Sequence, residues 1–413
     1  MTPYDLTLAI YNLTLFPVIF FSVLLIVLGA LNLFIRKESK VKAKVLEKLP
    51  FISVQVPTYN DPIAARCIQH CMLFDYPREM YEIIIVDDST NHATQKLLSG
   101  FAEKNQGFVR YIHRDNREGF KAGALKNAMD ITKGEIIVIF DSDWMPKKDF
   151  LQKIIKPFAD DKVALVQTRQ GIYNKDVNYI TRFAAYSLMV YHTIIMPINN
   201  RINCVFFCGT AGAIRRTMFE EVNGWNLNSL TEDSDLTVKL LLKGYKSIYL
   251  DIETPSEVPQ TFEGFIKQQM RWCYGNVRVF FDNAFDITLK KGLTIRQRLM
   301  ITYVTLGNII APIVVAMTVF GSIGWVIGDP KIIAVSDIIT LFSRFAITSG
   351  FLVIGLITLY KRDLIKDFPY LVASTMTIGI VLAVVNSIAF LRAAGNRKLH
   401  WYCTPKLEND KFI

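Results

Sequence analysis

The chain has 413 residues, of which 51% are apolar and 20% are charged, and its mean hydropathy is +0.26. This composition excludes a disordered protein and indicates a membrane protein with a sizeable soluble part. The net charge of +10 raises the question of nucleic acid. However, the basic residues gather beside the apolar ends and the sequence has no nucleic-acid-binding motif, so we expect no nucleic acid partner.

The first apolar stretch, residues 9–35, is long enough to cross a membrane. No Lys or Arg precedes residue 36, whereas the stretch is followed directly by basic residues: Arg36, Lys37, Lys40, Lys42, Lys44 and Lys48. By the positive-inside rule, residues 1–35 form an N-terminal transmembrane helix that enters the cytosol near residue 36. A cleaved signal peptide is the alternative, but it would need a basic start and a shorter apolar stretch.

Residues 36–260 have ordinary globular character and contain short runs rich in Val and Ile at 51–56, 82–86, 109–113 and 135–140. Segments with helical spacing separate these runs, which predicts an α/β domain with a mixed, mostly parallel sheet covered by helices. Each run ends in polar residues, at 57–61, 87–89, 114–116 and 141–143. Open α/β sheets bind ligands at that edge, so we expect the site there.

Asp141 and Asp143 follow the fourth run, and residues two apart on an extended segment face the same side. Both carboxylates are therefore expected to bind one hard cation, Mg²⁺ or Mn²⁺, together with diphosphate oxygens. A solvated turn is the alternative. The glycine patterns of dinucleotide folds and of phosphate-binding loops are missing from the sequence, which favours a metal as the means of reaching the phosphates.

Three further acidic or basic patterns each have a structural alternative. Asp87 and Asp88 follow the second run, where they either bind a base or ribose or cap the helix predicted at 91–100. The Thr231-Glu232-Asp233 tripeptide opens another helical segment and on its own is an ordinary helix start. Gln268, Arg271 and Trp272 share one face of an amphipathic stretch at 261–281, which alone would fit an interfacial helix.

Taken in order, these patterns resemble the family 2 glycosyltransferases, and most of all cellulose synthase, hyaluronan synthase and the mannan and glucomannan synthases. The resemblance runs from about Ile52 to Asn276 and is specific as a set. The segments that carry it are 56–60, Asp87-Asp88, 121–123, Asp141-Ser142-Asp143, 207–210 with Arg215-Arg216, Thr231-Glu232-Asp233 and 268–272. A further segment, 401–406, resembles the gating loop of these synthases.

This resemblance implies a GT-A-type, Rossmann-like domain that inverts the configuration at a sugar transferred from a UDP- or GDP-hexose. It implies Asp233 as the catalytic base and Asp141 and Asp143 as the metal site. The nucleotide sugar would be bound by Thr58, Tyr59, Asp87, Asp88, Lys121, Asp141, Gln268 and Arg271. The acceptor would be bound by Cys208, Gly209, Thr210 and Trp272. Glu232 and Asp235 are not expected to serve as the base.

The acceptor is less determined than the donor. A glycan acceptor and processive β-glycan synthesis are the favoured hypothesis, because residues 207–210 and the Thr-Pro-Lys segment near residue 404 look like polysaccharide synthases. The alternative is transfer of one sugar to a membrane lipid, as in ceramide glucosyltransferases, or to a polyprenyl phosphate. A non-catalytic membrane scaffold that keeps the fold would be expected to lack the carboxylates, all of which are present.

The C-terminal part contains apolar segments at about 299–327, 338–360 and 368–392. We expect interfacial helices at 261–298, transmembrane helices at 299–393 and a cytosolic tail at 394–413, in a multi-pass plasma membrane protein whose catalytic domain is cytosolic. Strict counting of four helices would place the tail outside, whereas the flanking basic residues favour the cytosol. An interfacial or re-entrant last segment would reconcile the two, with Asn386 near its polar side.

Overall fold

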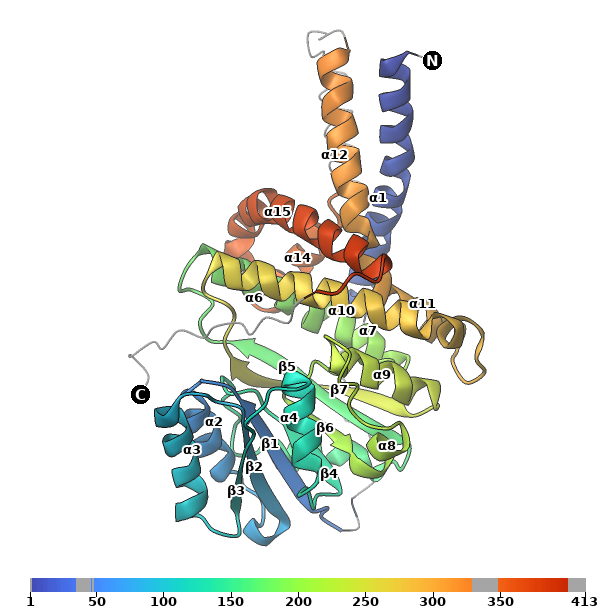
Figure 1. Ribbon diagram of the computed structural model, residues 1–413. Coiled ribbons are helices and arrows are strands. Elements are labelled where there is room, and N and C mark those ends of the chain that lie inside the picture. Colours follow the sequence, from blue (N-terminus) through green and yellow to red (C-terminus); the bar gives the residue numbers. More distant parts are fainter. Residues whose placement is uncertain (1, 35–45, 47, 329–347, 400–413) are drawn as a thin grey trace.

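The computed structural model describes residues 2–34, 46, 48–328 and 348–399. Helices α1 (Pro3–Phe34) and α12 (Ile310–Ile327) project side by side from an α/β domain (Figure 1). Helices α10 (Phe262–Leu289) and α15 (Phe368–Ala394) lie between that pair and the sheet (Figure 1). The soluble domain therefore meets the apolar helices through a layer of two further long helices.

The sheet has seven strands in the order β3-β2-β1-β4-β6-β5-β7. Strand β6 is antiparallel to both of its neighbours, and the other pairs are parallel. The predicted fold class is confirmed, and the four predicted runs correspond to the first four strands. The bounds are β1 (Ile52–Thr58), β2 (Tyr81–Asp87), β3 (Val109–His113), β4 (Ile136–Ile139), β5 (Val163–Ile172), β6 (Gly212–Arg215) and β7 (Lys246–Ser256).

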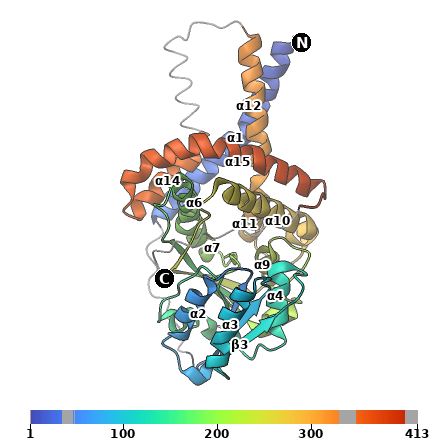
Figure 2. The same cartoon turned by 60° about the vertical axis from the view of Figure 1, so that its left-hand side comes forward.

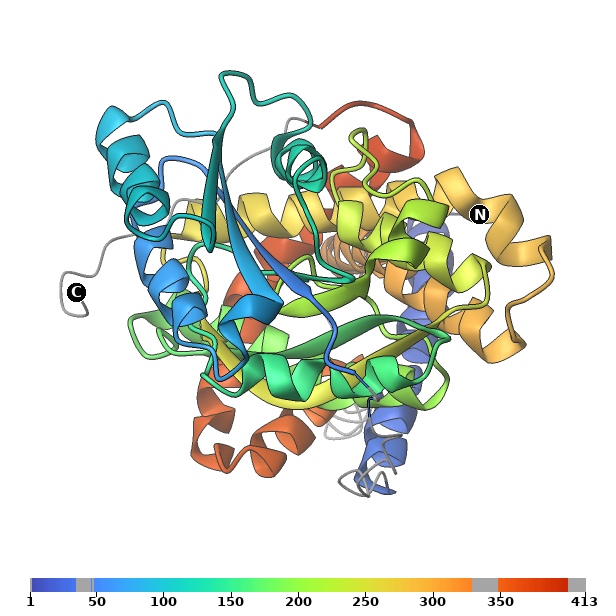
Figure 3. The same cartoon turned by 90° about the horizontal axis from the view of Figure 1, so that it is seen from below.

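Helices cover both faces of the sheet, as Figure 3 shows from below. Apolar side chains of one strand face pack against α2 (Ala64–Met72), α3 (His92–Lys104) and α5 (Phe150–Ile154). The opposite face packs against α4 (Phe120–Met129), α8 (Arg216–Glu221) and α9 (Glu232–Leu242). Both β2 and β4 are buried along their whole length, and most of their side chains are apolar on both faces, as is typical of parallel strands.

The strand order reverses between β1 and β4: the helices that follow β1 and β2 pack on one face of the sheet, and α4, which connects β3 to β4, packs on the other. Such a reversal opens a crevice at the carboxyl ends of the strands, where ligands bind in open α/β sheets. This is the edge at which the sequence places its polar residues.

The chain between β5 and β6 forms α6 (Tyr179–Val190), a π-helical turn (Tyr191–Ile195) and α7 (Met196–Arg201). Two more helices, α11 (Ile295–Leu306) and α14 (Gly350–Lys361), belong to the C-terminal part. Short 3₁₀ segments complete the description, at Arg78–Met80, Lys156–Ala159, Gly307–Ile309 and Ile365–Asp367.

Within the described residues, three helical segments are long and apolar enough to cross a membrane: Pro3–Phe34, Ile295–Ile327 and Ile365–Ala394. The predicted segment 338–360 is described only in part, where α14 is a shorter apolar helix. The basic residues at 36–44 and the segment 401–406 that resembles a gating loop lie outside the described residues.

Helix α15 does not run alongside α1 and α12. Figures 1 and 2 both show it lying across that pair, on top of α10. Cys273 and Val277 of α10 pack against Ala389 and Phe390 of α15, and the Cys273 thiol lies 3.4 Å from the carbonyl oxygen of Asn386. The last apolar segment is therefore a second layer on α10, which length and hydropathy alone could not indicate.

Candidate active site

The carboxyl ends of β1, β2 and β4 meet at one edge of the sheet. Thr58 and Asp87 are register partners at the ends of β1 and β2. Asp141 follows β4, and its backbone N–H donates to the Thr210 hydroxyl at 2.9 Å. This bond ties the end of β4 to the loop that precedes β6, so residues from four separate sequence segments surround one place.

Asp87 is fully buried and both of its oxygens are bonded within the protein. Oδ1 accepts the Ser89 backbone N–H at 2.9 Å, and Oδ2 accepts the Tyr111 hydroxyl at 2.8 Å. The helix cap considered from the sequence is made by Asn91 instead, whose side chain accepts the N–H groups of Ala93 and Thr94. Asp87 therefore shapes the turn after β2 and is not the cap of α3.

Asp88 forms a two-point ion pair with Arg114. The guanidinium donates to its two carboxylate oxygens at 2.7 and 2.5 Å, and Arg114 also donates to the Phe120 carbonyl at 3.1 Å. Such forked pairs fix geometry as well as charge. Arg114 thereby holds the segment between β3 and α4 against the end of β2, a role that the sequence analysis did not assign to it.

Arg117 belongs to this held segment and lies over Tyr59. Its guanidinium carbon is 3.2 Å from the centre of the Tyr59 ring. Sequence reasoning named Tyr59 for the nucleotide sugar but missed Arg117, which has no recognisable motif around it. Since guanidinium groups stack on flat aromatic surfaces, this pair offers a planar wall beside Asp87 and Asp88.

Lys121, in the first turn of α4, links two segments of the site. Its Nζ lies 2.5 Å from Asp141 Oδ1 and donates to the Gly209 carbonyl at 2.9 Å. Burial by itself would lower the pKa of Lys121, but the carboxylates of Asp141, Glu232 and Asp233 outweigh burial and raise this pKa. The ammonium group therefore stays charged among acidic side chains, where it can also meet an anionic ligand.

Gly209 brings the loop 208–210 against the start of α9. Its φ is +77°, and a Cβ at this position would lie 3.0 Å from Asp233 Oδ2 and 3.4 Å from Lys121 Nζ. Both the backbone conformation and the space therefore require glycine here. The same contacts show that Asp233, Lys121 and the carboxylate of Asp141 lie together.

Replacing Gly209 with Ala is expected to displace the Asp233 carboxylate and to strain the loop. We expect the melting temperature to fall by a few degrees, because a left-handed φ costs a β-carbon residue about 1–2 kcal/mol. Any activity of the site is expected to fall by at least about tenfold, since small displacements of reacting groups are costly. Differential scanning fluorimetry and initial rates would measure both effects. Gly244→Ala is the control, since that glycine also has a positive φ but nothing lies within 4 Å of its missing Cβ.

Asp233 is the acid whose environment is most altered. Burial, followed by the negative charge of Glu232, raises its pKa to about 7, against the opposing effects of the Ser234 N–H, Lys121 and Arg271. Its Oδ1 accepts the Ser234 backbone N–H at 2.8 Å. A carboxylate with a pKa near neutral is suited to take up a proton during a reaction.

Arg271 reaches this group from α10. Its guanidinium donates to the Leu230 carbonyl at 3.0 Å, while its buried Nε has no hydrogen-bond partner within the described part of the chain. Gly275, one turn later, lets α10 approach closely, because a Cβ there would lie 2.4 Å from the Thr231 side chain. Gln268 and Trp272 lie on the same helix and are both partly exposed. Asp233 and Arg271 therefore lie close together in the structure.

Asp143 is buried and bonded to the end of β7. Only 4% of its surface is exposed, and Oδ2 accepts the Glu257 backbone N–H at 3.0 Å. Within the described residues, no three His, Cys, Asp or Glu side chains gather closely enough to hold a metal by themselves. Asp141 and Asp143 are carboxylates, the ligand type that hard cations prefer, and a cation held there would take its remaining oxygens from a diphosphate and from water.

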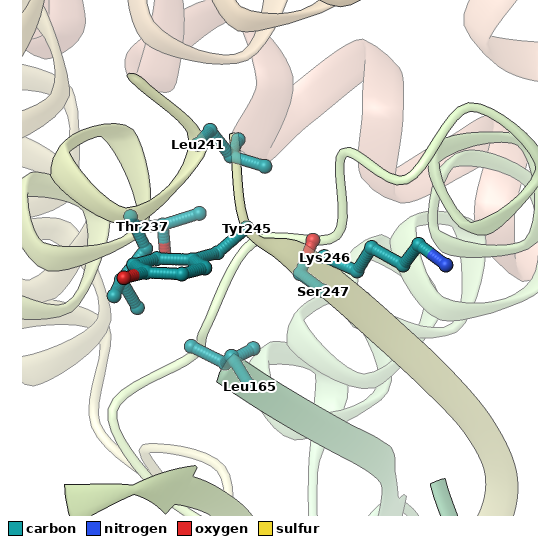
Figure 4. A pocket seen from close by; sticks show the side chains of 7 residues that line it. Leu165, Thr237, Leu241, Tyr245, Lys246 and Ser247 are labelled. Carbon is teal, nitrogen blue, oxygen red and sulfur yellow. The ribbon is translucent and has the colours of Figure 1, made fainter. Parts of the chain in front are cut away.

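Neighbouring acids have structural partners instead. The Asp235 carboxylate lies 2.7 Å from Lys239 Nζ, one turn along α9, and the Ser142 hydroxyl is hydrogen-bonded to Asp61. A small pocket behind α9, lined by Leu165, Thr237, Tyr245 and other residues, contains none of the predicted carboxylates (Figure 4). The acidic edge of the sheet is therefore the chemically distinctive place in the described structure.

The comparison that decides the family covers more than half of the chain. The profile described as glycosyl transferase family group 2 matches residues 136–384, which include Asp141, Asp233 and Arg271. The chain belongs to glycosyl transferase family group 2. The resemblance predicted from the spacing of these motifs is thereby confirmed.

Related family 2 glycosyltransferases are mannosyltransferases of plants. "Probable glucomannan 4-beta-mannosyltransferase 4" of Oryza sativa subsp. japonica is 35% identical over 62% of this chain and 48% of its own length. Glucomannan 4-beta-mannosyltransferase 9 of Arabidopsis thaliana is 33% identical over 62% of this chain and 50% of its own length. The chain thus spans about half the length of the curated relatives that it matches.

A solved structure supports the fold. The mannosyltransferase PcManGT from Pyrobaculum calidifontis, in complex with GDP-Man and Mn²⁺, aligns with a TM-score of 0.68 and 20% identity. The alignment covers 96% of this chain and 99% of that chain. The structural similarity therefore extends beyond the GT-A-like sheet domain.

Proposed function

We propose that this chain is a metal-dependent inverting glycosyltransferase that moves a hexose from a nucleotide diphospho-sugar to an acceptor hydroxyl at the cytosolic face of a membrane. The observation that carries this proposal is the meeting of Asp141, Lys121, Asp233 and Arg271 at the carboxyl edge of the sheet. These groups come from four segments of the chain, and together they supply a proton acceptor and fixed positive charges.

The chemistry is a single displacement. The acceptor oxygen forms a bond to the anomeric carbon while the bond from that carbon to the diphosphate oxygen breaks, and the nucleoside diphosphate leaves with the electron pair. The proton of the acceptor hydroxyl passes to Asp233, whose raised pKa suits it to hold that proton. Because the nucleophile enters opposite the leaving group, an α-linked donor gives a β-linked product.

The leaving diphosphate needs positive partners that are already in place. Lys121 and Arg271 are suited to this task, because each lies close enough to the acidic cluster to alter the pKa of Asp233. The guanidinium of Arg271 offers a planar fork for phosphate oxygens. Asp141 and Asp143 would hold Mg²⁺ or Mn²⁺, which would neutralise further charge on the diphosphate.

The remaining assignments concern recognition of donor and acceptor. Asp87, Asp88 and Thr58, with the Tyr59–Arg117 pair, lie at the ends of β1 and β2 and are proposed to bind the nucleotide. Cys208, Gly209, Thr210, Gln268 and Trp272 lie on the loop before β6 and on α10. We assign the acceptor to the loop and Trp272, and Gln268 to the donor side.

GDP-mannose is the first donor to test, because the relatives are named mannosyltransferases and the aligned structure holds GDP-Man. The purified full chain should be offered GDP-mannose, UDP-glucose and UDP-N-acetylglucosamine, with Mn²⁺, Mg²⁺ or EDTA, while release of nucleoside diphosphate is followed. We expect release from one donor, and only with a divalent metal. The proposal is wrong if no donor is turned over with metal, or if EDTA has no effect.

Transfer to a glycan, giving a β-linked polymer, is the favoured activity because the relatives are named glucomannan 4-beta-mannosyltransferases. Transfer of one sugar to a membrane lipid is the second candidate. It is favoured by the position of α10, which carries Arg271 and Trp272 and lies directly beneath the apolar helix α15. Labelled donor separates the two activities, since a polymer gives a ladder of products and a glycolipid gives one organic-soluble species.

The membrane arrangement follows from the helix layers. We propose that α1 and the continuous segment Ile295–Ile327 span the bilayer, whereas α15 lies in the interface on α10. Helix α10 carries charged residues, and the guanidinium of Arg278 donates to the Ala393 carbonyl near the end of α15 at 3.2 Å. If α15 crossed the hydrocarbon core of the bilayer, the charged guanidinium of Arg278 would be buried there without water, which is energetically costly.

If α15 is interfacial, Asn396 lies on the same side of the membrane as the catalytic domain. We expect Asn396→Cys, made with Cys208→Ser and Cys403→Ser, to react with a membrane-impermeant maleimide in vesicles that expose the catalytic face. It should not react in sealed vesicles of the opposite orientation. Glu103→Cys on the exposed surface of α3 marks the catalytic side in the same assay. If the cysteine at position 396 reacts in the vesicle orientation in which the cysteine at position 103 does not, the interfacial assignment is wrong.

A further inference from the structure

The π-helical turn Tyr191–Ile195 interrupts an otherwise regular helix beside the site. Single π-helical turns are rare and concentrate at functional positions. Tyr191, the first residue of this turn, packs with Cys208 against a cluster formed by Met196, Val205 and Tyr249. Cys208 directly precedes Gly209, whose missing Cβ faces Asp233 Oδ2, and both Cys208 and Asp233 act electrostatically on the Tyr191 phenol, so Tyr191 lies close to the acceptor side of the site.

The chemistry of Tyr191 suits that position. Burial, with Cys208 and Asp233 adding to it, raises the pKa of the Tyr191 phenol well above its usual value. The hydroxyl therefore stays neutral and can donate a hydrogen bond to a sugar oxygen, while the ring covers apolar C–H groups.

Side chains from elsewhere hold the carbonyls of this turn. The Tyr249 hydroxyl donates to the His192 carbonyl at 3.0 Å, and the amide of Asn32 donates to the carbonyls of Thr193 and Ile194 at 2.9 and 3.4 Å. Arg362, directly after α14, donates to the Thr193 hydroxyl at 3.0 Å. The turn is thus fastened both to the sheet and to the apolar helices.

Asn32 is the central member of this contact. It lies near the end of α1, is 1% exposed, and its Oδ1 accepts a hydrogen bond from Lys361 Nζ at 2.5 Å. A polar side chain in an apolar helix is costly unless it is fully hydrogen-bonded, and it commonly marks a functional contact. Asn32 meets this condition by joining α1, α14 and the π-helical turn.

We propose that Asn32 is a positioning residue for the acceptor side of the site: it holds the π-helical turn and thereby holds Tyr191 against Cys208. This inference rests on the proposed function for the identity of the acceptor, but its geometric part does not depend on any substrate. The first apolar helix would then do more than anchor the chain, because it would set the geometry in which an acceptor meets Asp233.

Asn32→Asp tests this proposal, because the carboxylate keeps an acceptor for Lys361 and loses both amide donors to the turn. Ser22→Ala is the matched control: Ser22 is also buried in α1 and also contacts α14, accepting the Gly350 N–H at 2.7 Å, but it is not bonded to the turn. Both variants of the full chain would be compared in lipid nanodiscs.

The first measurement needs no substrate. Among the described cysteines, Cys208 is the one that is not buried, so its alkylation rate by N-ethylmaleimide, followed by peptide mass spectrometry, reports on contact with Tyr191. We expect Asn32→Asp to raise this rate severalfold and Ser22→Ala to leave it near the wild-type value. Equal rates in Asn32→Asp and wild type would overturn the proposal.

The second measurement uses GDP-mannose with mannotetraose as acceptor. We expect Asn32→Asp to raise the KM for mannotetraose about tenfold, with the Kd for GDP-mannose unchanged by calorimetry. Tyr191→Phe should have a similar effect, and the double variant should be less than additive. Additive effects, or equal losses for donor and acceptor, would overturn the proposal. If the wild type transfers nothing from GDP-mannose, that donor assignment fails, while the alkylation result still decides the role of Asn32.

Discussion

Asp233→Asn is expected to lower the rate of sugar transfer by about a thousandfold or more, because loss of a general base costs about 10²–10⁴ in rate. The amide cannot accept the proton of the acceptor hydroxyl, yet it has nearly the same shape as the carboxylate. Its oxygen can still accept the Ser234 backbone N–H, so the start of α9 should be preserved. Initial rates at saturating donor would measure the loss, and calorimetry should show that donor binding persists.

Asp235→Asn is the matched control for this substitution. Asp235 lies two residues further along the same helix, but its carboxylate is paired with Lys239. We expect it to retain most of the transfer rate and to lose some thermal stability. Transfer by Asp233→Asn at a rate within a few fold of wild type would remove Asp233 from the role of base.

The pH dependence of transfer provides an independent check on Asp233. Its pKa of about 7 means that the carboxylate is mostly protonated below neutral pH, so the rate should fall about tenfold per unit below that value and level off above it. Glu232→Gln removes one cause of the raised pKa, so the fall in the transfer rate should begin at a lower pH in this variant. A pH profile that is flat between pH 5 and 7 would contradict the assignment.

The same raised pKa also affects the stability of the fold, and here the effect of pH is opposite to its effect on the transfer rate. The folded protein keeps a proton on Asp233 over a range, from the ordinary value of 3.8 to about 7, in which the unfolded chain has lost it. Asp233 therefore makes the folded state progressively less stable as pH rises through this range, and its contribution is constant above it. The transfer rate is thus higher at pH values above the pKa of Asp233, whereas the contribution of Asp233 to stability is more favourable below that pKa.

The strands in the first half of the sheet could be predicted because the local sequence of each one indicates a strand. β2 and β4 are buried on both faces and consist mostly of consecutive apolar residues, whereas the equally buried β1 alternates apolar residues with Ser53 and Gln55. β6 has only four residues, and its place between β4 and β5 depends on pairings between distant segments. β7 is half exposed and carries Asp251, Glu253 and Pro255, so its composition does not indicate a strand.

The residues that lie together at this edge of the sheet could be predicted where they belong to a sequence motif. Asp141, Lys121, Asp233 and Arg271 were all named from the sequence, and the structure places them together. Arg117 and Asn32 were missed, because each acts through a contact that no local pattern encodes. The orientation of α15 could not be predicted from hydropathy alone either, because it is determined by packing against α10.

Asp143→Asn is expected to lower the affinity for the nucleotide sugar in the presence of Mn²⁺ by about 30-fold or more, because a bound divalent ion contributes several kcal/mol at a diphosphate and each 1.4 kcal/mol is about tenfold. The Asn oxygen can still accept the Glu257 N–H, so the link between the end of β4 and β7 should persist. The variant removes one negative charge from the cation site without opening a cavity.

Calorimetric titration of the donor with Mn²⁺ and with EDTA would measure this effect. In the wild type the Kd for the donor should be much lower with Mn²⁺ than with EDTA, whereas in Asp143→Asn the two Kd values should be nearly equal. Asp149→Asn serves as the control, because that carboxylate lies near in sequence and is half exposed in a pair with Lys153. If Asp143→Asn keeps the wild-type response to Mn²⁺, the ion is held by other groups, and Lys121 with Arg271 would then carry the stabilisation of the leaving diphosphate.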